Sequence, residues 1–77
     1  MWIMGQNEKS LFNVDRFDGI HIYRTKDDNN FVIVGIDKET GTEIDLAKYK
    51  TEDRAKDVLI DMLACIENVR YIMPSEN

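Results

Sequence analysis

The sequence predicts an α+β fold, an antiparallel β-meander of four to five strands packed on one C-terminal α-helix. Two observations predict it. Apolar and polar residues alternate along short segments within residues 1–49, and this is the period of a β-strand. From residue 52 onward the apolar residues recur every three or four positions, which indicates a helix with one apolar face. With 77 residues, the chain has room for a single domain.

Polar turns separate the strand segments. We expect strands over residues 2–6, 11–14, 19–25, 31–36 and 42–46, the last running on to Tyr49. Ile20 and Ile22 should share one face of their strand, with His21 on the other. Residues 31–36 read Phe-Val-Ile-Val-Gly-Ile, a continuous apolar run typical of a strand covered on both faces. The sheet is therefore expected to curl into a half-barrel or to receive a second chain.

A helix is expected over residues 52–68, with Thr51 as its N-cap because its hydroxyl can accept a bond from a free amide of the first turn. Residues 69–74 are apolar enough to dock, with room for a short extra strand, and residues 75–77 should fray. The expected apolar stripe of the helix contains Ala55, Val58, Leu59, Met62, Ile66 and Val69.

Two motifs lie near the ends of the chain. The opening reads W-I-x-x-Q-N-x-x-x-L-x-N from Trp2 to Asn13, and the helix entry reads L-x-x-Y-x-T-x-x-R-A-K-x-V-L from Leu46 to Leu59. They resemble a small uncharacterised protein family of low-GC Gram-positive bacteria and their phages. Here Gly5 replaces the usual Ser, and the middle hairpin is unmatched. The resemblance implies a meander-plus-helix fold and no known activity.

The charge balance bears on the possible partners. Fifteen acidic residues against ten basic ones leave a net charge of −5, which disfavours binding to the phosphate backbone of nucleic acids. No apolar run approaches the roughly 20 residues that span a bilayer, so we expect no membrane partner. Cys65 is the single cysteine, and with no signal-peptide pattern at the start, a cytoplasmic location is expected.

No catalytic motif is visible, and we expect no enzyme activity, no cofactor and no metal site. The serines do not stand in a Gly-x-Ser-x-Gly elbow. The chain has one histidine, His21, and one cysteine, so neither a zinc cluster nor a catalytic pair is indicated. The run Asp27 to Asn30 lacks the spacing and the distal Glu of a calcium loop.

The outer surface of the helix offers a candidate interface. Ile60 is expected away from the apolar stripe, with Leu63 at the stripe's edge, and acids at a spacing of four residues flank them. A two-fold homodimer would place this patch against its copy. The candidate interface residues are Ile60, Leu63, Ala64, Asp57 and Asp61.

The function predicted from these features is that of a non-catalytic small protein-interaction module that self-associates. Two alternatives stay open. One is a phage-type acidic inhibitor, a nucleic-acid mimic that occupies the basic site of a host enzyme. The other is a single-strand nucleic-acid binder, which the net charge of −5 disfavours.

Overall fold

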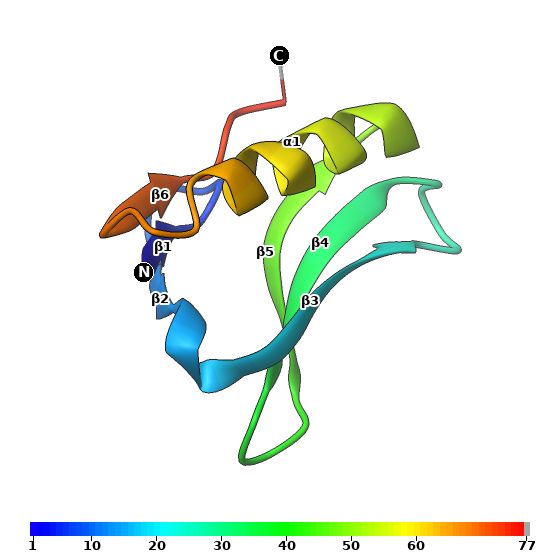
Figure 1. Cartoon of the computed structure of the whole chain (residues 1–77). Coiled ribbons are helices and arrows are strands. Elements are labelled where there is room, and N and C mark those ends of the chain that lie inside the picture. The colour runs from blue at the N-terminus through cyan, green and yellow to red at the C-terminus, as the bar shows by residue number, and fades with distance from the viewer. Residues whose placement is uncertain (77) are drawn as a thin grey trace.

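The computed structural model describes residues 1–76, and these form six strands, one α-helix and one short 3₁₀ helix (Figure 1). The predicted α+β fold with a C-terminal helix is confirmed, and the strands divide between two three-stranded sheets. The elements are β1 (Trp2–Met4), β2 (Leu11–Asn13), η1 (Val14–Arg16), β3 (Phe17–Arg24), β4 (Phe31–Asp37), β5 (Glu43–Tyr49), α1 (Glu52–Ala64) and β6 (Arg70–Ile72).

The main sheet has the order β3-β4-β5, with antiparallel pairing throughout. The helix α1 lies across one face of this sheet (Figure 1), which we call the inner face. Ile33 at the centre of β4 is fully buried there, opposite Ile22 of β3 and Ala47 of β5. Ala55, Val58 and Met62 of α1 are buried in the same core.

A β-bulge changes the alternation of β5. Ile33 pairs with Ala47, but the next residue, Val34, pairs with Asp45, so that Leu46 is the extra residue. As a result Leu46 and Ala47 are both buried although they are neighbours in the sequence. A bulge places two residues opposite one and bends the strand. The strand continues to Tyr49, as the sequence predicted.

Phe17 belongs to β3, although the sequence analysis left it outside the strands. It is buried in the core, and its ring lies against Gly35 of β4. A Cβ atom added to Gly35 would lie 2.7 Å from a ring carbon of Phe17. Glycine at this position therefore lets the Phe17 ring cover the end of the inner face.

The small sheet has the order β2-β1-β6 and joins the two ends of the chain. β1 and β2 form the expected N-terminal hairpin, while β6 pairs parallel to β1. The amide of Trp2 donates to the carbonyl of Val69 at 2.8 Å, and that of Met73 donates to the carbonyl of Met4 at 3.1 Å. The residues that follow α1 are therefore docked, as expected, with Tyr71 buried in the core.

The helix begins as expected and ends early. The Thr51 hydroxyl accepts a bond from the Arg54 amide at 3.1 Å, which makes Thr51 the N-cap. The helix ends at Ala64, so the expected end near residue 68 is wrong. The chain turns after Ala64, and the Val69 carbonyl accepts a bond from β1, so that Ile66 and Val69 are exposed rather than part of the apolar stripe.

The outer face of the main sheet points away from α1. Val32 and Val34 of β4 are only 2% and 1% exposed, yet they lie outside the core cluster. Tyr23 and Lys48 pair with Val32 from the two sides, and His21 and Asp45 pair with Val34. Neighbouring strands thus cover these valines within a single chain, and burying this strand does not require the expected second chain.

Candidate functional site

An apolar groove lies between β3 and α1. The helix packs over β4 and β5, so the inner-face residues Ile20 and Ile22 of β3 are only half-buried. The volume of the groove is about 380 Å³. It is lined by Ile20, Leu59, Ile60, Met62, Leu63 and Ile66.

Three lining residues of the groove expose more than half of their surface. Ile60 is 65% exposed, Leu63 is 68% exposed and Ile66 is 55% exposed. Since every lining side chain is apolar, the groove offers no side-chain hydrogen bond to a ligand. Contiguous exposed apolar surface of this kind is typical of protein interaction sites. The chemistry of the groove therefore suits another apolar surface.

The structure divides the predicted interface residues. Ile60 and Leu63 line the groove together, and Ala64 and Asp57 are exposed on α1. Asp61 does not line the groove. At about 100° per residue, Asp61 and Leu63 point roughly 200° apart around the helix. Asp61 faces β6, where its carboxylate accepts a bond from the Tyr71 hydroxyl at 2.7 Å.

The bond between Tyr71 and Asp61 anchors β6 to the helix. Burial and this hydrogen bond raise the pKa of the Tyr71 phenol well above its ordinary value. The phenol therefore remains protonated and a hydrogen-bond donor at neutral pH. The sequence shows no local sign of this bond because its partners are ten residues apart and belong to different elements.

A second apolar surface was missed by the sequence analysis. It is the solvent face of the small sheet, where Trp2, Leu11 and Ile72 are exposed. Met4 shares this face because it pairs with Leu11 and Ile72. The alternation of Trp2, Ile3 and Met4 indicates that Trp2 and Met4 share one face of their strand. The sequence does not show that β6 pairs with this strand and adds Ile72 to that face.

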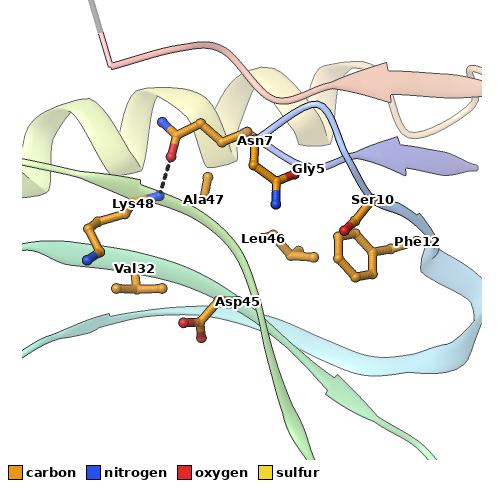
Figure 2. Close-up of a pocket in the computed structure, with 10 residues that line it drawn as sticks. Gly5, Asn7, Ser10, Phe12, Val32, Asp45, Leu46, Ala47 and Lys48 are labelled. Atoms are coloured by element: carbon orange, nitrogen blue, oxygen red, sulfur yellow. Dashed lines mark hydrogen bonds between the residues drawn. The ribbon is translucent and has the colours of Figure 1, made fainter.

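A smaller pocket of about 220 Å³ lies where the loop after β1 crosses the edge of β5 (Figure 2). Gln6 holds this crossing. Its backbone amide donates to the Leu46 carbonyl at 3.2 Å, and its side-chain Oε1 accepts a bond from the Lys48 backbone amide at 2.9 Å. Its Nε2 also donates to the Pro74 carbonyl at 3.4 Å. Gln6 thus joins both sheets and the tail, and its polar groups are used in holding the fold.

Two carboxylates are held in turns by hydrogen bonds. The hydroxyl of Thr25 and the ammonium of Lys48 lower the pKa of Asp28 to about 2. The amides of Thr40 and Glu39 lower the pKa of Asp37, with a smaller contribution from Arg16. Both carboxylates stay ionised to low pH and fix the hairpin loops of the main sheet.

His21 and Cys65 lie on opposite sides of the main sheet. His21 belongs to the outer face of β3, because the inner-face residues Ile20 and Ile22 flank it. Cys65 caps the end of α1 and packs against the core on the inner side. Among residues 1–76, no group of three His, Cys, Asp or Glu side chains is placed to hold a metal ion.

Three comparisons with known proteins gave no match. No family model matches the chain, no curated protein matches it, and no solved structure matches it. The resemblance to the small Gram-positive and phage family therefore stays a prediction. Within the part of the chain that the structure describes, no helix is long and apolar enough to cross a membrane.

Proposed function

We propose that this chain is a non-catalytic protein-interaction module that works as a homodimer and associates through the apolar groove beside α1. The observation that carries the proposal is the groove itself: six apolar residues in a chain of net charge −5, three of them more than half exposed. Burying a large apolar side chain stabilises by about 1.5–3 kcal/mol. The groove thus holds enough apolar surface to favour association.

A second copy is the partner that the shape of this surface favours. The surface combines a groove, in which Met62 is buried and Ile20 half-buried, with the exposed side chains of Ile60 and Leu63 on α1. In a two-fold contact each residue of one copy meets the other copy's equivalent surface, so exposed side chains beside a groove are self-complementary. The acidic Asp61 points toward β6, which reduces the charge that would be buried.

Sedimentation velocity over a range of protein concentrations tests this function. We expect the parent chain to shift from a 9 kDa species to one of twice that mass as concentration rises. Ile60→Glu should abolish the shift, because it places a carboxylate in an apolar contact. A monomer at every concentration would contradict the proposal.

The matched control is Ile72→Glu. Ile72 is 59% exposed, close to the 65% of Ile60, but it lies on the small sheet. We expect this variant to associate as the parent chain does. If Ile72→Glu abolishes association and Ile60→Glu does not, the interface is the face of the small sheet and the groove is not the site. The two other functions predicted from the sequence stay predictions.

A further inference from the structure

The two edges of the main sheet differ in whether their outward backbone groups are hydrogen-bonded. Along β5, Gln6 bonds to the carbonyl of Leu46 and the amide of Lys48, so this edge is partly occupied. β3 forms the other edge over eight residues. Within residues 1–76, no backbone bond outside its pairing with β4 involves residues 18–24.

Natural proteins blunt exposed edges with proline, lysine, short strands or covering segments, since unpaired backbone groups are a template for another strand. Residues 18–24 contain neither proline nor lysine. The strand has one irregularity, at Asp18, where the pairing with β4 shifts between Phe17 and Gly19. From Gly19 to Arg24 its edge is regular and open.

We infer that a second copy of this chain adds its β3 antiparallel to β3, forming one continuous six-stranded sheet. This inference rests on the proposed function and states how the two grooves meet. Each groove opens beside β3, because Ile20 of that strand lines it. A two-fold axis perpendicular to the sheet keeps both α1 helices on the same face, so each groove is closed by the other copy.

The alternation of side chains restricts the register. Directly opposite residues of an antiparallel pair point to the same face. With both inner faces on one side, the residue on the two-fold axis must therefore pair with its own copy. Near the middle of β3, the candidates for that residue are Ile20, His21 and Ile22.

Charge selects His21 among the three. Asp18 is the acidic residue of β3 and Arg24 its arginine, and they lie near the two ends of the strand. With His21 on the axis, Ile20 pairs with Ile22 of the second copy, and the other copy's Arg24 lies at the irregular end that carries Asp18, within reach of its long side chain, twice in the dimer. With Ile22 on the axis, Ile20 faces Arg24, and with Ile20 on the axis, Ile22 faces Asp18. Only the His21 register matches apolar with apolar and acid with base.

A charge-swap experiment tests the pairing. Asp18→Arg gives each copy two cations at its edge, and Arg24→Asp gives each copy two anions. Like charges placed opposite each other destabilise strand pairs, so each variant alone should dimerise at least about tenfold more weakly than the parent chain. An equimolar mixture of the two variants should regain near-parent affinity as a heterodimer. A mixture no tighter than either variant overturns the inference.

A cysteine scan tests the register in a Cys65→Ser background. His21→Cys should form an interchain disulfide readily, because self-paired residues lie about 4.5–5.5 Å apart between Cα atoms. Tyr23→Cys is the matched control: it is exposed on the same face, and its copy would be displaced by about 13 Å along the strand. That separation exceeds the roughly 7 Å limit of a disulfide.

The outcomes separate this inference from the proposed function. Sedimentation that shows a dimer, with no His21→Cys disulfide or with Tyr23→Cys linking equally well, overturns β3 pairing and leaves the groove dimer standing. A parent chain that remains monomeric in sedimentation overturns both. A dimer with the disulfide at position 21 alone, and heterodimer rescue in the charge swap, supports both.

Discussion

Ile33 and Val34 are neighbours in β4, and both are almost inaccessible to solvent, but their surroundings differ. Ile33 lies on the inner face, inside the core cluster beneath α1. Val34 lies on the outer face between His21 and Asp45 of the adjacent strands. One residue is buried under a second layer, and the other by the side chains beside it. The comparison teaches that two side chains with the same exposed fraction can lie at different distances from water. Four substitutions probe the inner and outer sides of the molecule.

The largest effect is expected from Ile33→Asp. A carboxylate beneath α1 would have no partner in the core and no route to water, and its cost exceeds the margin of a small domain. We expect the variant to be unfolded at 25 °C, with far-ultraviolet circular dichroism showing no cooperative melt. A variant with a parent-like melting curve would contradict the burial of Ile33 beneath α1.

A smaller loss is expected from Val34→Lys. The lysine stem can cover the sheet while its ammonium reaches water, and Asp45 lies directly opposite. We expect a folded protein destabilised by about 1–2 kcal/mol through lost apolar burial. Urea unfolding measures the loss, and Ile33→Lys serves as the matched variant on the inner face. Equal losses at the two positions would erase the distinction between the faces.

Tyr71→Phe probes a polar contact at the margin of the inner side. It removes the bond to Asp61 while keeping the buried ring. Because Asp61 is exposed and can rebind water, we expect a loss of about 1 kcal/mol in the free energy of unfolding. Combining this change with Asp61→Ala should cost little more than either alone, since both remove one interaction. Additive losses would contradict the pairing.

The smallest effect is expected at Asp28, which bonds to Lys48 on the outer side at 3.3 Å. Its pKa in the folded chain is lowered from 3.8 to about 2. A lowered pKa contributes stability above pH 3.8 that is lost as the pH falls toward 2. Asp28→Asn should therefore lower the melting temperature slightly at pH 6, with the difference vanishing near pH 2. Asp27→Asn, in the same loop, is the control.

The elements of the chain were largely predictable, and their ends were not. Alternation and helical spacing are local signals, and they located the hairpin strands and the start of α1 at Thr51. The segment after α1 is held by the bond from the Trp2 amide to the Val69 carbonyl, a contact between residues far apart in the sequence that local patterns do not show. The bulge at Leu46 lies where the loop after β1 meets β5, since the Gln6 backbone amide donates to the Leu46 carbonyl, and a window of neighbouring residues does not show this contact.

The candidate site was predictable in part for the same reason. Ile60 and Leu63 were identified because apolar residues outside a helical stripe are visible in the sequence. The bond between Asp61 and Tyr71 could not be predicted, because Tyr71 belongs to a strand whose pairing the sequence does not show. The contribution of Ile20 to the groove depends on α1 lying over β4 and β5 and leaving β3 partly uncovered.

The parallel pairing of β1 with β6 has a consequence for the order of folding. The two strands are joined through the hairpin, the main sheet and α1, so their pairing closes a long loop. Trp2 and Ile3 can therefore reach their final environment only after the elements between the two strands have come together. Since Trp2 is the sole tryptophan, its fluorescence should report the closing step of folding, after the main sheet has formed.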